Sequence, residues 1–123
     1  MATQENAITK TGDFMKWFLP KLEAFPRNAK FLFGDRIVAL QLSLLEKLIE
    51  AYYGNPKLAS LKAANIEIEK LRQLIRICSD LRYISIKQLE FATAALNETG
   101  GMTGGWIRQQ EARGGQARRP ADA

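Results

Sequence analysis

The sequence predicts an all-α fold, an antiparallel up-and-down four-helix bundle. Apolar residues recur at spacings of three and four along most of the chain, as they do on one face of a helix. Proline, glycine and polar clusters divide the sequence into four such segments with short connections, and the alternation typical of strands is missing. With 123 residues, 46% of them hydrophobic, the chain can bury one core. We expect the bundle over residues 12–111, with a flexible leader at 1–11 and a disordered Gly/Arg-rich tail at 112–123.

The first helix is expected to start at Gly12 and to end near Phe25. Pro20 lies inside this segment and should bend the helix, because proline removes one backbone hydrogen bond. Pro26 keeps the residue before it out of the α region, so the helix stops there. The apolar face of this helix consists of Phe14, Trp17, Phe18, Leu22 and Phe25.

The corner that follows Pro26 combines aromatic and basic residues, and the second helix leaves it to run over about 28–53. Asn28 can cap this helix through its side-chain oxygen. Gly54 and Pro56 suit its end, because glycine is favoured just past a helix and proline cannot continue one. The corner is either an ordinary interhelical turn or a positively charged site: Phe25, Phe31 and Phe33 can bury it, and Arg27, Lys30 and Arg36 surround it with charge.

The third helix is expected over about 56–81, followed by a short link at 82–84. Arg72 and Arg76 are four residues apart and therefore lie on one side of this helix, beside its apolar face. That face consists of Leu58, Leu61, Ile68, Leu71, Ile75 and Cys78.

The fourth helix opens with Ser85 and Gln88, which form the pattern of a capping box. A glycine-rich block at 100–105 follows, and helix propensity favours a flexible loop there, since each glycine costs about 1 kcal/mol relative to alanine. The alternative is a continuous helix whose glycines form a strip for close approach of another helix or subunit. We expect the helix, ending near Glu111, because Trp106 and Ile107 need an apolar surface.

Several functional classes are excluded or disfavoured by composition. Histidine is absent, which excludes a histidine-based catalytic triad or metal site, and the sequence holds no phosphate-binding loop or nucleophile elbow. Cys78 is the lone cysteine and is expected to be a core residue rather than a nucleophile. No apolar run reaches the roughly 18 residues that a membrane span needs. We expect a cytoplasmic, non-catalytic protein without cofactor or metal.

Binding remains the plausible role, because Lys and Arg number 18 against 13 Asp and Glu, a net charge of +5. Arginine makes bidentate contacts with phosphates and carboxylates. The alternative for each arginine is a solvated surface position or a salt bridge between helices. The candidates for contacts with nucleic acid or a partner are Arg27, Lys30, Arg36, Arg72, Arg76, Arg82 and Arg108.

Self-association is also expected. A chain of this size has a limited core in which to bury Trp17, Trp106 and Tyr52 or Tyr53, and aromatic residues left on a surface favour an interface. Together with the glycine strip, this predicts an oligomer interface that includes Trp17, Gly101, Gly105 and Trp106.

A set of short motifs follows in order along residues 14–108. They are Leu19-Pro20, Phe25-Pro26-Arg27, Phe31 with Gly34-Asp35-Arg36-Ile37, Leu44-Leu45-Glu46, Ala64-Asn65, Leu71-Arg72, Leu74-Ile75-Arg76, Asp80-Leu81-Arg82 and Gly104-Gly105-Trp106-Ile107. In this ordered set the sequence resembles the accessory variability determinant family of diversity-generating retroelements. The resemblance implies a four-helix bundle that assembles into a pentameric ring, binds the retroelement's reverse transcriptase and supports mutagenic retrohoming. It also implies a basic surface for nucleic acid, namely template RNA or cDNA, with Arg72 and Arg76 in the binding role and no catalytic centre.

A second resemblance leaves another function open. The sequence is also similar to bundle proteins encoded in intervening sequences of large-subunit ribosomal RNA, which implies an oligomeric interaction module with no nucleic-acid role. A neighbouring reverse-transcriptase gene would favour the retroelement function. A steep salt dependence of binding would do the same, because phosphate contacts release counterions.

Overall fold

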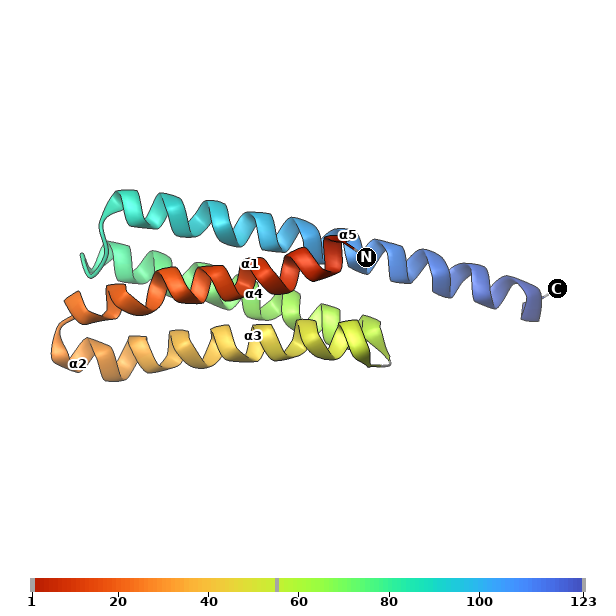
Figure 1. Ribbon diagram of the computed structural model, residues 1–123, viewed down its shortest axis with the longest axis horizontal. Coiled ribbons are helices and arrows are strands. Elements are labelled where there is room, and N and C mark those ends of the chain that lie inside the picture. The colour runs from red at the N-terminus through yellow and green to blue at the C-terminus, as the bar shows by residue number, and fades with distance from the viewer. Residues whose placement is uncertain (1, 55, 123) are drawn as a thin grey trace.

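A computed structural model describes the backbone of residues 2–54 and 56–122 and the side chains of residues 5–54 and 56–114. Over these residues the chain forms four long helices joined by short connections and contains no strand. Each helix packs against its neighbours in the chain, and the first also packs against the last, which closes the bundle (Figure 1). The predicted all-α four-helix bundle is confirmed. The helices are α1 (Ala2–Phe18), α3 (Asp35–Tyr53), α4 (Lys57–Asp80) and α5 (Ile86–Asp122).

The core runs along the centre of the bundle and draws on one face of each helix. Its large side chains recur at the spacing that the sequence indicated, so the apolar stripes found by periodicity are the buried ones. None of the helices over the described residues combines the length and hydropathy that crossing a bilayer requires. The larger buried apolar residues are Phe14, Phe18, Phe25, Ile37, Leu40, Leu44, Leu48, Leu61, Ile68, Leu71, Ile75, Ile84, Leu96 and Trp106.

Helix α1 begins well before Gly12, so the expected start of the first helix is wrong. Within the stretch expected as a flexible leader, Ala7 is fully buried. Thr11 is buried as well, and its hydroxyl donates a hydrogen bond of 2.9 Å to the Ala7 carbonyl. The sequence pattern missed this turn because the residues buried there, Ala7 and Thr11, are small rather than large and apolar.

Proline shapes the passage from α1 to α3. Pro20 lies in a short 3-10 helix, η1 (Leu19–Ala24), so it ends the α-helix instead of bending one that continues. Phe25 has the extended conformation expected before Pro26, with ψ of 144°. Asn28 is not the cap, because Pro26 occupies the N-cap position of the next helix.

A π-helical turn opens the second helical segment. The short helix α2 (Arg27–Ala29) passes into η2 (Lys30–Gly34), a π-helix, which passes directly into α3. The helix expected over 28–53 is therefore confirmed, with one wider turn that the sequence did not indicate. A wider turn changes which side chains face the core, since it rotates the residues before it relative to those after it.

Between α3 and α4 the chain reverses at Gly54. A Cβ atom at this position would lie 2.6 Å from the carbonyl oxygen of Glu50, so only glycine fits. Lys57, the first residue of α4, folds back and donates hydrogen bonds of 2.8 and 2.9 Å to the carbonyls of Ala51 and Tyr52. These bonds satisfy carbonyls at the end of α3 that have no partner inside the helix.

Helix α5 begins with the predicted capping box. The Gln88 amide nitrogen donates to the Ser85 hydroxyl at 3.0 Å, and the Ser85 amide donates to the Gln88 side chain at 2.8 Å. The glycine-rich block 100–105 is helical, as expected. The expected end near Glu111 is wrong: α5 extends to Asp122 and takes in most of the range 112–123 expected as a disordered tail.

Candidate partner-binding surface

The candidate site is a surface, because most of the basic residues singled out from the sequence are exposed on the outside of the bundle. The described residues contain no group of three or more His, Cys, Asp or Glu side chains that could hold a metal ion. Cys78 is fully buried, and burial raises the pKa of its thiol to about 11. The thiol is therefore neutral near pH 7, which makes Cys78 a poor nucleophile.

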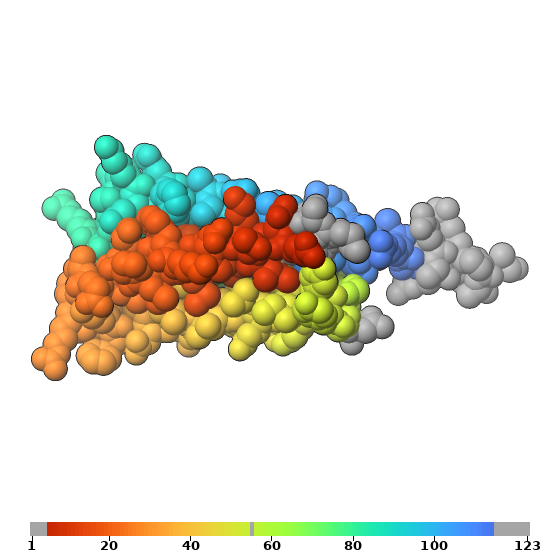
Figure 2. Space-filling model, viewed as in Figure 1, coloured from red at the N-terminus to blue at the C-terminus, as the bar shows by residue number. Residues whose placement is uncertain are grey.

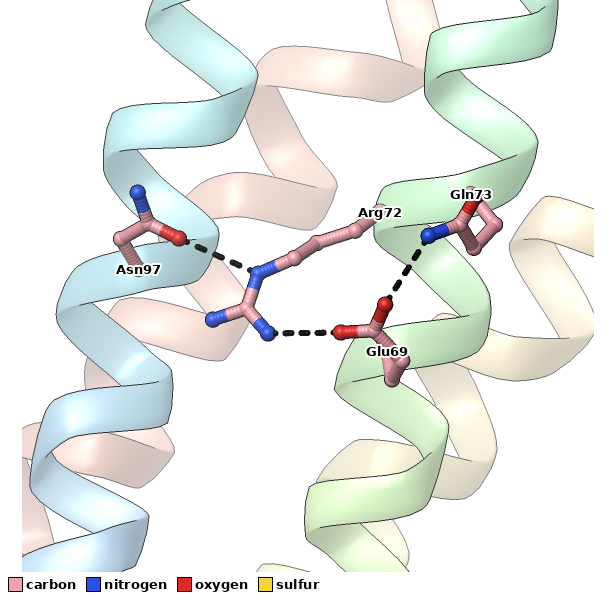
Figure 3. Close-up of polar contacts among 4 residues, drawn as sticks. All are labelled: Glu69, Arg72, Gln73 and Asn97. Carbon is pink, nitrogen blue, oxygen red and sulfur yellow. Dashed lines mark hydrogen bonds and ion pairs between the residues drawn. The ribbon is translucent and has the colours of Figure 1, made fainter.

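The side chain of Arg72 makes contacts within the bundle and is not free to bind a partner. Its Nε donates a hydrogen bond of 3.1 Å to the Asn97 amide oxygen on α5 (Figure 3). Its Nη1 donates one of 3.0 Å to Glu69 on its own helix, and Gln73 donates another of 3.0 Å to the same carboxylate. The bond from Gln73, and then that from Arg72, lowers the pKa of Glu69.

Gly100 makes room for this arginine. A Cβ atom at Gly100 would lie 2.7 Å from Nη2 of Arg72, so the guanidinium rests against the bare backbone of α5. The structure thus joins two features that the sequence treated separately, the paired arginines and the glycine block. For Arg72 it favours the interhelical alternative, with the side chain only 31% exposed.

Arg76 has a different environment, although it lies one turn further along α4. It is exposed and makes no ion pair with any side chain that the structure describes. Arg72 and Arg76 therefore do not form one paired site: the first bridges two helices, and the second is open to solvent.

The remaining basic candidates gather at one end of the bundle. Arg27 and Arg36 are exposed, and Lys30 lies 3.8 Å from Glu23, a long contact between two exposed groups. Arg36 helps to line a shallow hollow at the start of α3. The hollow is lined by Phe31, Leu32, Asp35, Arg36 and Ala39.

Ring contacts attach the link between α4 and α5 to the same end. The Tyr83 ring packs against Phe25, with centroids 5.5 Å apart, and against Phe33 at 6.0 Å. Arg82 precedes this tyrosine and is exposed. We call this end, residues 19–36 and 76–87, the corner end. The two segments lie at the left in Figures 1 and 2. Their basic residues include Arg27, Lys30, Arg36, Arg76 and Arg82.

Nearly all of the net charge lies at the corner end. It carries seven basic and three acidic side chains, whereas the rest of the described side chains comprise nine of each sign. The positive excess is thus not spread over the surface. An anionic partner would be attracted to this end of the bundle and not to its sides.

Arg82 has a backbone conformation that glycine would adopt at a lower cost in free energy. Its φ is 65°, the one positive φ at a non-glycine position among the described residues. The Arg82 amide donates to Ser79 at 2.9 Å and the Tyr83 amide to Cys78 at 2.8 Å, which is the Schellman arrangement that ends α4. A side chain in the left-handed region costs roughly 1 kcal/mol.

Large apolar side chains are exposed beside these charges. Phe31 is 67% and Leu32 70% exposed, and Ile86, at the start of α5, is 71% exposed. The expectation that Phe31 helps to bury the corner is wrong, because it lies in the π-helical turn and faces outward. Phe25 is buried and Phe33 half-buried, as expected.

Arg108 lies apart from the corner end, near the other end of the bundle on α5. Its guanidinium folds back along its own helix, 3.6 and 3.7 Å from where Cβ atoms of Gly104 and Gly105 would lie. Those glycines therefore border an arginine of the same helix, and among the described residues no atom of a neighbouring helix lies within 4 Å of their Cβ positions.

The residues expected at an oligomer interface have mixed positions. Trp106 is 3% exposed and belongs to the core, so the expectation that it remains on the surface is wrong. Trp17 is half-buried, stacks on Phe91 with centroids 4.5 Å apart, and carries Lys21 over its ring at 4.9 Å. Gly101 faces open space.

Comparison with models of protein families gives a match over most of the chain. The family model described as bAvd-like matches residues 7–110, a span that covers most of the chain and includes the whole corner end. A comparison with curated proteins finds no match.

Proposed function

Because the chain belongs to the bAvd-like family, the accessory variability determinants of diversity-generating retroelements, we propose that it is the non-catalytic accessory protein of such an element. In this role it binds the element's reverse transcriptase together with template RNA or cDNA, in the cytoplasm, and supports mutagenic retrohoming. The family match over residues 7–110 carries the proposal.

The charge distribution supports an anionic partner. Seven basic side chains against three acidic ones at the corner end provide a local positive field, while the rest of the described surface is balanced. Arg27, Arg36, Arg76 and Arg82 are all exposed there. We assign the binding role to these residues and not to Arg72, whose donors already serve Asn97 and Glu69.

We further propose that the protein acts as a homo-oligomer, a closed pentamer. Exposed apolar side chains on the outer face of α3, Leu42 and Ile49, support a subunit contact, since they are too far from the core to be buried within one chain. Trp17, Gly101 and Gly105 remain candidates for the same contact. A sedimentation mass near that of one chain at micromolar concentrations would contradict the pentamer.

Co-purification tests the main proposal. The chain is expressed with the reverse transcriptase of the proposed retroelement, with and without template RNA. We expect the polymerase to be retained, and binding of template RNA to weaken steeply with salt because phosphate contacts release counterions. A chain that purifies without the polymerase in the presence of template RNA would overturn the proposal.

A further inference from the structure

We propose that copies of the chain join head to tail, with the face between α3 and α4 of one copy packed against the face between α1 and α5 of the next. This inference rests on the homo-oligomer of the proposed function. It adds the two surfaces that meet and the way in which their contact closes a ring.

The first surface is a hollow between α3 and α4, two helices that pack against each other. The hollow has a volume of about 530 Å³. Its apolar lining comes from Leu40 on α3 and from Ile66 and Leu74 on α4. Ile66 is 58% exposed, so a single chain leaves this apolar surface open to solvent. We call it the α3–α4 hollow.

The second surface is a hollow of about 360 Å³ between α1 and α5, which also pack against each other. Phe14 and Phe91 line it together with Ala94 and Ala95, whose side chains are too short to fill the space between the two helices. Phe91 is 52% exposed. This α1–α5 hollow is therefore a second apolar surface that the bundle itself leaves uncovered.

The two hollows carry opposite excess charge. Two basic and one acidic side chain line the α3–α4 hollow, whereas one basic and two acidic side chains line the α1–α5 hollow. In the second hollow Lys10 and Glu98 form an ion pair of 3.3 Å, which leaves Asp13 without an ion pair among the described side chains. Asp13 of one copy is thus complementary to the positive excess of the next copy.

The positions of the hollows favour a head-to-tail contact. Neighbouring helices pack in the order α1, α3, α4, α5 and back to α1, so the two hollows lie on opposite sides of the bundle. A two-fold contact would place one hollow against its own copy, with like charges facing each other, and would leave the other hollow uncovered. A head-to-tail contact covers both and can be repeated from copy to copy.

The hollows also lie at the same level along the bundle, which favours a closed ring over a filament. The α3–α4 hollow uses residues 66–74 of α4, and the α1–α5 hollow uses residues 91–98 of α5. The hydrogen bond of 3.1 Å from Arg72 to Asn97 joins these two spans. Successive copies are therefore not displaced along the bundle axis, and a head-to-tail contact without such a displacement closes into a ring.

Sedimentation of surface variants tests the contact. Ile66→Asp places a charge in the α3–α4 hollow, and Ile86→Asp is the matched control, because Ile86 is 71% exposed and lines neither hollow. Circular dichroism should show the helical spectrum of the parent for both variants, since both positions are exposed. We expect Ile66→Asp to reduce the mass to that of one chain and Ile86→Asp to retain the mass of the parent. An Ile66→Asp chain that retains the parent mass would overturn the inference.

Crosslinking tests the direction of the contact. Gln73→Cys lies in the α3–α4 hollow and Ala94→Cys lies beside the other, and both are exposed positions. In a Cys78→Ala background, a short bismaleimide reagent should link chains that carry both cysteines into a ladder that ends at the number of subunits in the ring. Chains that carry only one of the two cysteines should remain unlinked. Linked pairs from a single-cysteine chain, or no ladder from the double variant, would contradict a head-to-tail contact.

The outcomes separate this inference from the proposed function. If the parent sediments as one chain, the proposed oligomer and this inference both fail, while co-purification with the polymerase still decides the accessory role. If the parent is an oligomer but Ile66→Asp leaves its mass unchanged, the two surfaces are wrong and the oligomer stands.

Discussion

The guanidinium of Arg72 lies directly on the backbone of Gly100, so that a Cβ atom there would be 2.7 Å from Nη2. The contact joins α4 and α5 at a point where α5 presents no side chain. It also explains why a glycine is tolerated in the middle of α5. The arginine that covers Gly100 donates a hydrogen bond to Asn97, which lies one turn earlier on the same helix.

Substituting glycines of the block tests this relationship. Gly101→Ala should raise the free energy of unfolding by about 1 kcal/mol, because alanine favours the helix and the position faces open space. Gly100→Ala should bring no such gain, since the new methyl group displaces Arg72 and its hydrogen bonds. Urea unfolding of both variants measures the difference, and equal gains would contradict the contact.

Gly101→Ala also tests whether this face of α5 contacts another subunit. If the glycine packs against a neighbour, the added methyl group should lower the mass observed in sedimentation. If the face is open in the assembly, the mass should be unchanged and only the stability should rise.

Removal of each arginine on α4 should have different effects on stability. Arg72→Ala is expected to lower the free energy of unfolding by about 1 kcal/mol, since it removes the donor to the Asn97 amide oxygen and one of the two donors to the Glu69 carboxylate. Arg76→Ala should change it by less than about 0.5 kcal/mol, as is usual for an exposed surface residue. Thermal or urea unfolding provides the comparison, and equal losses would refute the bridging role of Arg72.

Gln41 is a polar residue in the core, and replacing it with an apolar residue should raise the free energy of unfolding. It is fully buried, and both amide atoms lack a hydrogen-bond partner among the described residues. Gln41→Leu should raise the free energy of unfolding by about 1–3 kcal/mol, because it removes an unsatisfied buried amide at similar volume. Gln41→Glu, which would bury a charge, should destabilise the bundle. A leucine variant that is less stable than the parent would show that the amide has a structural role.

The Cys78 thiol should make the free energy of unfolding depend on pH in the alkaline range. Its usual pKa is 9.0 and burial raises it to about 11, so the folded state favours the neutral thiol. The stabilisation is complete below pH 9 and is lost between pH 9 and pH 11, where the unfolded chain loses the proton first. The loss amounts to roughly 2–3 kcal/mol at pH 11. Comparison with Cys78→Ala isolates it, since the other titrating groups are common to both chains.

The helices and their inward faces could be predicted because local patterns determine them. Apolar spacing identified the stripe from Ile37 to Leu48, Gly54 marked the turn, and Ser85 with Gln88 marked the start of the last helix. The helical glycine block was also predicted, although propensity opposes it. Trp106 is buried in the core, and its burial requires the helix to continue through the glycine-rich block.

The corner end could not be predicted in detail, because its geometry depends on contacts distant in the sequence. The π-helical turn rotates Phe31 outward, and no spacing rule signals that change of register. The left-handed conformation of Arg82 is equally hidden, since glycine or asparagine is the usual indicator there. In the same way, the role of Arg72 depends on Asn97, a residue on another helix that periodicity does not connect with it.

The two chain ends lie on the side of the molecule away from α2, as Figure 1 marks them. The hydrogen bond of 2.9 Å from the Tyr52 hydroxyl to Glu5 fixes the start of α1 at that side. A sensor chip or affinity resin attached through either terminus would therefore be linked at the side of the molecule away from the corner end. Phe31, Leu32 and Arg82 would then point into the flowing solution, where immobilisation does not obstruct them.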